Sequence, residues 1–240
     1  MSAGSGLIVD LSQRYSDGSY LAHNPGWHAE HGAMKARWID AILKRNGLEP
    51  MTIAEIGCGS GELLVELKAR RPRAQITGFE ISSQAYAICS AKQAEGLEFR
   101  LENLISASAG PFDLVMAIDV FEHVPDYLGF LRELKGKGGH TLFHIPLDLS
   151  VQALLRATSY PILRNQTGHL HYFFKYTALA TLRDCGYEIL DWTYTRSSQE
   201  LPGKGLKTKI ANVPRRLVQL FSEDLSARLL GGYSLMVLAR

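Results

Sequence analysis

The stretch "EIGCGSG" at residues 55–61 decides the fold. It follows the apolar run "MTI" and precedes a helix-like run, "ELLVELKAR" (62–70). A glycine-rich turn between a strand and a helix lets the backbone approach a ligand closely. The spacing here is G-x-G-x-G, whereas a dinucleotide fingerprint reads G-x-G-x-x-G, and no Gly-Lys-Ser/Thr follows as in a P-loop. The loop therefore predicts a ligand at the end of a first strand and disfavours a dinucleotide.

Strands and helices alternate along the chain after this loop. The expected strands are "TIAEIG", "AQITGFEI", "LEFRLEN", "FDLVMAIDV", "HTLFHIP", "YEILDWTYT" and "GGYSLMVLAR". Helix-like runs separate most of them, and "MKARWIDAILKRNG" precedes the first. This alternation predicts an α/β protein with a mostly parallel sheet covered on both faces.

Composition places the chain among ordinary globular proteins. Its 240 residues suffice for one sizeable core, and the formal net charge of +2 does not suggest a nucleic-acid partner. No apolar run approaches the roughly 20 residues of a membrane helix, and the N-terminus lacks the pattern of a secretory signal. Three scattered cysteines, Cys58, Cys89 and Cys185, argue against a disulfide framework and favour the cytoplasm.

Polar residues come at the ends of the next expected strands. Glu80 ends the second strand, a little over twenty residues after the first glycine, where an acid accepts hydrogen bonds from both ribose hydroxyls. Asn103 ends the third strand, where its amide can read an adenine edge. The fourth strand ends in "AIDVFEHVPD" (117–126). Together with the glycine loop, these residues predict a ligand that contains a nucleoside.

Together these motifs resemble the class I S-adenosylmethionine (SAM) dependent methyltransferases over about residues 50–195, and the small-molecule branch that includes the ubiquinone-type O-methyltransferases. The resemblance implies a doubly wound, Rossmann-like sheet of seven strands with the last one antiparallel. It also implies that Glu55 lies near the amino-acid end of SAM and that Glu80 holds the ribose. Position 103 is usually Asp in that family, and the amide of Asn103 makes a weaker contact. The expected cofactor contacts in this domain are Glu55, Gly57, Cys58, Gly59, Gly61, Glu80, Ile81, Asn103, Leu104, Asp119 and Val120.

Methyl transfer to a hydroxyl or an amine requires a base, and a neutral histidine suits that task near pH 7. We rank His171 and His169, in "TGHLHYF", as the first candidates, followed by His123 and then His144. For each of them a structural hydrogen-bonding role is an equal alternative. Glu122 with the histidines at 123, 169 and 171 also offers metal donors, but their spacing does not define a site, and no metal is predicted.

Two segments lie outside the alternating pattern. Residues 1–50 form an aromatic-rich N-terminal segment, which we expect to be a lid over SAM, with a packing strap as the alternative. Its candidate contacts are Tyr15, Tyr20, Trp27 and His28, whose aromatic faces attract a sulfonium. Residues 197–230 form a basic helical excursion within the SAM-binding domain, 51–240. This excursion is either a packing helix with a solvated face, or a cap whose part 197–216 attracts an anionic substrate or a membrane surface.

The predicted function is methyl transfer from SAM to oxygen or nitrogen of a small molecule, with a saccharide or other anionic metabolite favoured. An RNA or protein methyltransferase is one alternative, although no nucleic-acid module is appended and the "NPPY"-type tetrapeptide is absent after the fourth strand. A SAM-binding module without activity is another alternative, and a dehydrogenase is disfavoured by the early third glycine. The oligomeric state is left open.

Overall fold

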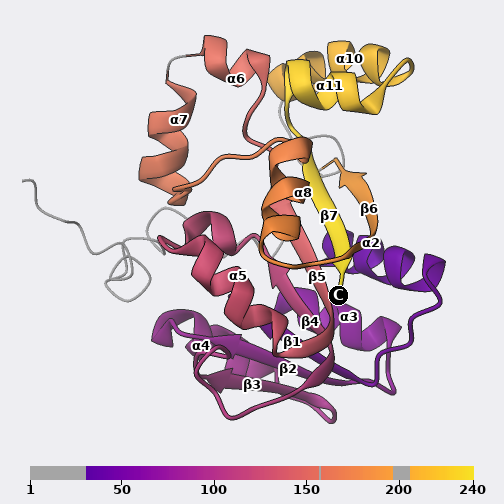
Figure 1. The fold of residues 1–240 in the computed structure, drawn as a ribbon, viewed down its shortest axis with the longest axis vertical. Coiled ribbons are helices and arrows are strands. Elements are labelled where there is room, and N and C mark those ends of the chain that lie inside the picture. Colours follow the sequence, from indigo (N-terminus) through magenta and orange to yellow (C-terminus); the bar gives the residue numbers. More distant parts are fainter. Residues whose placement is uncertain (1–30, 157, 197–205) are drawn as a thin grey trace, which may run out of the picture.

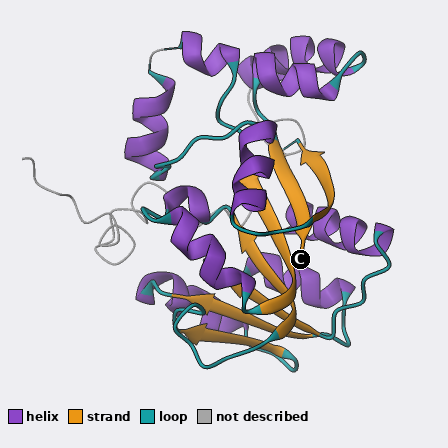
Figure 2. Ribbon diagram, in the orientation of Figure 1, coloured by secondary structure: helices purple, strands orange, loops and turns teal. Residues whose placement is uncertain are grey.

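The structure is a computed structural model that describes residues 31–156, 158–196 and 206–240, with the backbone alone for 206–212. The candidate lid contacts Tyr15, Tyr20, Trp27 and His28 lie outside the described residues. The elements, shown in Figures 1 and 2, are α2 (Gly32–Arg45), β1 (Thr52–Ile56), α3 (Glu62–Arg70), β2 (Gln75–Glu80), α4 (Ser83–Cys89), η3 (Ser90–Lys92), β3 (Leu97–Leu101), β4 (Phe112–Ile118), η4 (Phe121–His123), α5 (Tyr127–Lys135), β5 (Gly138–Pro146), α6 (Val151–Leu155), α7 (Ser159–Ile162), η5 (Leu163–Thr167), α8 (Lys175–Asp184), β6 (Ile189–Thr195), α10 (Leu206–Gln219), α11 (Glu223–Leu230) and β7 (Ser234–Ala239).

One seven-stranded sheet organises the described chain, in the order β3-β2-β1-β4-β5-β7-β6. Strands β1 to β5 pair in parallel, and β7 is antiparallel to both β5 and β6. This confirms the predicted α/β class, the seven strands and the antiparallel last strand. The strand order reverses between β1 and β4, and ligands of doubly wound sheets bind at the carboxyl ends of the strands beside such a reversal.

Helices cover both faces of the sheet, because successive strand residues point to opposite sides. Ile53 faces a cluster that contains buried residues of α2, α3 and α4, whereas the next residue, Ala54, faces a cluster formed with α5 and α8. Leu64 and Leu67 of α3 and Leu131 of α5 are fully buried in these clusters. The strands are therefore apolar on both faces, which is typical of central parallel strands.

Local sequence sets where the helices begin and end. Ser82, Asp126, Ser150 and Ser222 each accept a hydrogen bond from a backbone N–H in the first turn of the following helix. Such N-caps satisfy donors that the helix itself leaves unpaired. Helix α3 ends at Arg70, two residues before Pro72, which cannot continue a helix.

Helix α2 packs into the same core as the sheet. Its residues Ile39, Ile42 and Leu43 are fully buried in the cluster that also holds Ile53 and Leu64. The part of the N-terminal segment that the structure describes is thus anchored on the domain. The closure of residues 1–50 over SAM stays a prediction.

The burial of α2 predicts its contribution to stability. We expect Ile39→Ala to lower the free energy of unfolding by about 2–5 kcal/mol, since it leaves a cavity in the core. Arg37→Ala, at an exposed position of the same helix, is the matched control and should change stability by less than about 0.5 kcal/mol. Urea unfolding followed by circular dichroism measures both. Equal, small losses would show that α2 is not part of the cooperative core.

Candidate functional site

The glycine loop between β1 and α3 needs glycine for two physical reasons. Gly57, Gly59 and Gly61 have φ values of +68°, +55° and +76°, in the left-handed region that side chains rarely adopt. A Cβ on Gly61 would also lie 2.6 Å from the ring of Phe99. The backbone N–H groups of Gly57 and Cys58 donate to the Phe79 carbonyl at 2.8 and 3.1 Å, which fixes the loop beside the end of β2.

Glu80 is held by backbone donors at the end of β2. One carboxylate oxygen accepts from the N–H of Gly59 at 2.8 Å, and the other accepts from Ile81 and Ser82, each at 2.8 Å. Burial raises the pKa of Glu80, and these N–H groups oppose that shift. Because a carboxylate has about four acceptor sites, Glu80 keeps capacity for further donors such as ribose hydroxyls.

Glu55 is a buried acid at the end of β1. Burial raises its pKa to about 8, although the charge of Lys35 opposes the shift. Its Oε2 atom has no hydrogen-bond partner among the described residues. An unsatisfied buried acceptor costs free energy unless a donor reaches it, so Glu55 offers a place for a cationic donor such as an ammonium group.

Asp119, the residue after β4, joins two elements that are distant in sequence. Lys35 of α2 donates to one of its carboxylate oxygens at 2.7 Å, and Nδ1 of His144 in β5 lies 2.5 Å from the other. The other ring nitrogen of His144 lies 2.7 Å from the hydroxyl of Thr195. Burial raises the pKa of Asp119, but the charges of His144 and Lys35 outweigh it and hold the pKa well below the ordinary range. His144 is 1% exposed, with both ring nitrogens engaged.

The histidine segment after η5 is tied to the end of β4 by backbone hydrogen bonds. The carbonyl of Glu122 accepts from the N–H groups of Leu170 at 2.8 Å and His171 at 3.2 Å. The carboxyl of Glu122 is fully buried, and burial together with the charge of Asp119 raises its pKa well above the ordinary value. Burial and the neighbouring charge both favour the protonated form of this carboxyl.

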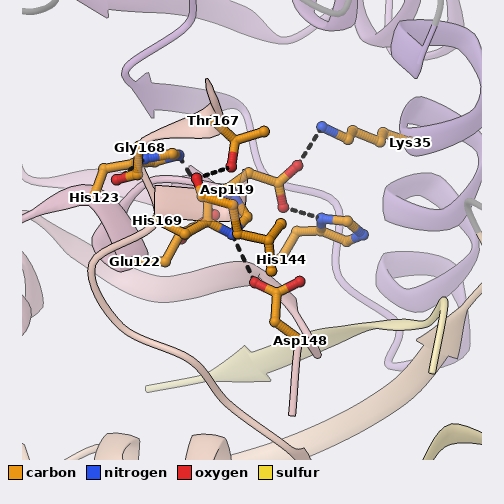
Figure 3. Close-up of polar contacts among 10 residues, drawn as sticks. Lys35, Asp119, Glu122, His123, His144, Asp148, Thr167, Gly168 and His169 are labelled. Atoms are coloured by element: carbon orange, nitrogen blue, oxygen red, sulfur yellow. Dashed lines mark hydrogen bonds and ion pairs between the residues drawn. The ribbon is translucent and has the colours of Figure 1, made fainter. Parts of the chain in front are cut away.

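The three candidate histidines beside η4 differ in what holds them. Nδ1 of His169 lies 2.6 Å from a carboxylate oxygen of Asp148, and Nδ1 of His123 lies 3.1 Å from the carbonyl of Gly168. The two rings are 4.9 Å apart, between their centroids. Nε2 of His171 lies 2.9 Å from the Val124 carbonyl. Figure 3 shows the Asp148–His169 pair and the Lys35–Asp119–His144 chain in one region of the molecule.

Glu122, His123 and His169 form the candidate metal-binding group among the residues that the structure describes. Each offers one donor atom, and these atoms lie within 4.8 Å of one another. An Asp148 carboxylate and a Gly168 carbonyl hold the Nδ1 atoms of the two histidines, an arrangement that orients histidine ligands at metal sites. The absence of a metal stays a prediction.

The other predicted residues lie at the same edge of the sheet in different environments. Asn103 is exposed, and its side-chain oxygen accepts from the N–H of Ile105 at 3.0 Å. Leu104 is fully buried, whereas Ile81 is 60% exposed. A Cβ on Gly57 would lie 3.2 Å from Val120, which places Val120 against the glycine loop.

Sequence reasoning did not single out Lys35 or Asp148. The position of Asp148, two residues after β5, was a usable signal, because polar residues at parallel strand ends converge. Lys35 carried no such signal, since a lysine on an amphipathic helix is usually solvated.

The fold and the site fit SAM. Left-handed glycines leave room for close approach, Glu80 keeps acceptor sites for a ribose, and Glu55 holds an unsatisfied acceptor at the neighbouring strand end. A Rossmann-like sheet that carries these features defines a SAM-dependent methyltransferase. A family profile described as "Methyltransferase domain" matches residues 27–191, more than half of the chain, and the chain belongs to this family.

Similar proteins agree with this assignment. The ubiquinone biosynthesis O-methyltransferase of Pseudomonas paraeruginosa is 29% identical over 172 residues, which cover 66% of this chain and 72% of the relative. The enzyme of the same name from Acinetobacter baumannii is 30% identical over 120 residues, or 46% of this chain and about half (49%) of the relative. The crystal structure of magnesium protoporphyrin IX methyltransferase from Synechocystis with bound S-adenosylhomocysteine (SAH) shares the fold. Its TM-score is 0.64 at 15% identity, over 95% of this chain and 98% of that one.

The position of Glu80 predicts its role in SAM binding. We expect Glu80→Ala to weaken SAM and SAH binding by about 1–3 kcal/mol, the scale of hydrogen bonds lost to a charged group. Glu98→Ala, an exposed acid of β3, is the matched control and should leave both affinities unchanged. Isothermal titration calorimetry measures them, with circular dichroism to verify folding. Full affinity in Glu80→Ala would refute the placement of the ribose.

The raised pKa of Glu55 predicts a pH dependence of stability. The folded protein retains this proton up to about pH 8, whereas an unfolded chain releases it near the ordinary value of 4.5. Between these pH values the folded state binds more protons, so its free energy of unfolding falls as pH rises, by up to about 1.4 kcal/mol per pH unit from this group.

We therefore expect Glu55→Gln to flatten the pH dependence of urea unfolding in that window. Glu95→Gln, which removes a charge from an exposed position, serves as the control. Parallel curves for the parent protein and Glu55→Gln would show that Glu55 ionises like an ordinary surface acid.

Proposed function

We propose that this SAM-dependent methyltransferase acts on a hydroxyl oxygen of a small molecule, with His169 as the general base and Asp148 as its positioning residue. The observation that carries the proposal is the 2.6 Å contact between Nδ1 of His169 and the Asp148 carboxylate. It favours the tautomer with the proton on Nδ1, whose Nε2 is then the basic atom. The O-methyltransferase names of the relatives support oxygen as the acceptor atom.

The other histidines are less suited to the task. His144 is buried, and both of its ring nitrogens are engaged by Asp119 and Thr195. Nε2 of His171 is used by the Val124 carbonyl, and its ring packs on Tyr127 at 4.2 Å between centroids. We therefore place His169 ahead of His171, which the sequence ranked beside it.

When bound, SAM supplies a methyl group on a positively charged sulfur. SAH, in which that sulfur is neutral, is a good leaving group. Glu80 would hold the ribose of the cofactor and Glu55 its amino-acid end, and Nε2 of His169 removes the proton of the acceptor hydroxyl. Asp148 orients the ring and stabilises the charge that the ring acquires. The ion pair of Lys35 with Asp119 fixes the end of β4 beside these groups.

The class of acceptor is the finer part of the proposal. A saccharide or another anionic metabolite is supported by the basic residues of segment 204–216, Lys204, Lys207, Lys209, Arg215 and Arg216. Arg215 donates instead to the backbone carbonyls of Leu230 and Gly231, which weakens that support. Release of SAH against a panel of phenols, neutral sugars, sugar phosphates and amines tests the acceptor class.

A cytoplasmic location stays a prediction. The three free, buried cysteines agree with it.

A metal-assisted transfer is the second candidate, favoured by the donor atoms of Glu122, His123 and His169. A divalent cation there would lower the pKa of a bound hydroxyl and replace the base. The histidine pair would then act as ligands. The buried carboxyl of Glu122, whose proton a cation would displace, is the residue that separates the two candidates.

The proposed base predicts the kinetics of two variants. We expect His169→Gln to lower kcat by about 10²–10⁴-fold, the usual contribution of a general base. Asp148→Asn should cause a smaller loss in the same parameter, because the ring stays but its orientation is no longer enforced. SAM affinity should be unchanged in both. SAH release with the best acceptor of the panel is the assay.

His140→Gln is the control, since His140 lies at the amino end of β5, away from the site. Dialysis against EDTA, followed by addition of Mg²⁺, Mn²⁺ or Zn²⁺, separates the two candidates. Turnover that survives EDTA supports the base. Turnover that disappears and returns with one metal would replace it by the metal-assisted reaction.

A further inference from the structure

An apolar surface is exposed on the helices that follow β5 and β6. We call it the apolar cap and define it by Leu154, Leu155, Leu217, Leu220, Phe221 and Leu225. Phe221 is 90% exposed, Leu155 81% and Leu220 80%. Monomeric proteins seldom expose gathered side chains of this size unless they meet a partner or a membrane.

Arg215 links the three helices that carry the apolar cap. Arg215 of α10 donates to the carbonyls of Leu230 and Gly231 at the end of α11, at 3.0 and 2.9 Å. The same guanidinium lies 3.3 Å from the side-chain oxygen of Gln152 in α6. Figure 1 shows α6, α10 and α11 together at one end of the molecule. The exposed leucines therefore belong to a connected unit.

Helix α11 turns its polar side toward the protein. Asp224 accepts from the hydroxyl of Tyr194 at 2.7 Å and pairs with Lys175. Glu223 pairs with Arg196 at 2.7 Å, and the fully buried Ser226 accepts from the Tyr233 hydroxyl at 2.9 Å.

The orientation of α11 is the reverse of what an ordinary surface helix shows. Leu225 and Leu229 lie one turn apart and are 42% and 38% exposed, while Ser226 and Ala227 are buried. The sequence left open that this segment is a packing helix with a solvated face, which would bury its apolar side. Instead, the apolar side of the helix faces outward.

Charge indicates what the apolar cap meets. The side chains that the structure describes in 213–222 include two basic residues, Arg215 and Arg216, and no acidic one. Arg156, directly after α6, and Arg216 of α10 are exposed, and the acids of α11 pair with residues of the protein body. A second copy would bring an equally basic surface against this one, whereas an anionic bilayer is complementary to both the charge and the apolar side chains.

We propose that the apolar cap docks this protein on an anionic membrane surface, with Leu220 and Phe221 entering the boundary between headgroups and acyl chains. No helix among the described residues has the length and hydrophobicity to cross a bilayer, so the contact is peripheral. The apolar cap lies at the end of the sheet where the proposed base pair lies, because Asp148 is two residues before Ser150, the N-terminal capping residue of α6. Docking would thus place the acceptor side of the enzyme near the membrane.

Vesicle sedimentation of the full chain tests the proposal. We expect binding to phosphatidylcholine vesicles that contain phosphatidylglycerol, weaker binding to phosphatidylcholine alone, and release by added salt. The double variant Leu220→Ser/Phe221→Ser should partition at least about tenfold more weakly, since two large apolar groups no longer enter the bilayer. Met51→Ser, a 51% exposed side chain before β1, is the matched control and should bind like the parent.

The outcomes separate the membrane from other occupants. A parent protein that stays in the supernatant with both vesicle types overturns the proposal, as does a double variant that sediments like the parent. Light scattering that shows a dimer abolished by the double variant would assign the apolar cap to a second copy. Unchanged thermal unfolding of the variants, together with unchanged SAM affinity, confirms that lost sedimentation reflects the surface.

Discussion

The structure depends on four carboxyl groups that gather at the carboxyl edge of one sheet, three of them buried and one, Asp119, partly exposed. Glu55, Glu80, Asp119 and Glu122 follow or end neighbouring strands and cannot all be charged without compensation. They are accommodated in three ways: Glu80 by three backbone N–H groups, Asp119 by Lys35 and His144, and Glu55 and Glu122 by raised pKa values. Glu80 and Glu55 keep acceptor capacity, which suits the hydroxyl and ammonium donors that SAM carries.

This constraint explains why distant elements meet at the site. The ion pair of Lys35 with Asp119 ties α2 to the end of β4, and His144 ties the same carboxylate to β5 and, through Thr195, to β6. Loss of either partner would leave the partly buried charge of Asp119 with less compensation. The backbone carbonyl of Glu122 then fixes the segment that carries His169 and His171. Electrostatics at the sheet edge and placement of the base are therefore parts of one arrangement.

The helices beyond this edge, α10 and α11, are an insertion between two strands of the sheet. Helices α10 and α11 lie between β6 and β7, where the alternating pattern is interrupted, and their polar groups bond to the protein body. An excursion of this kind adds a surface without disturbing the sheet, because β7 still pairs with β5 and β6. The domain thus combines the sheet edge that carries the candidate cofactor residues and an apolar cap on the helices beyond it.

The sequence alone determined the alternating elements, the glycine loop and the acid at Glu80, because each depends on neighbours within a few residues: a hydrophobic period, a left-handed turn, a strand end. The tertiary structure decided that His144 and His169 each have a carboxylate partner, that His144 is enclosed, and that Lys35 reaches Asp119, 84 positions away. It also decided that the leucine stripe of α11 faces outward. A helical period shows that one side of a helix is apolar, but only the packing of the whole chain determines where that side points.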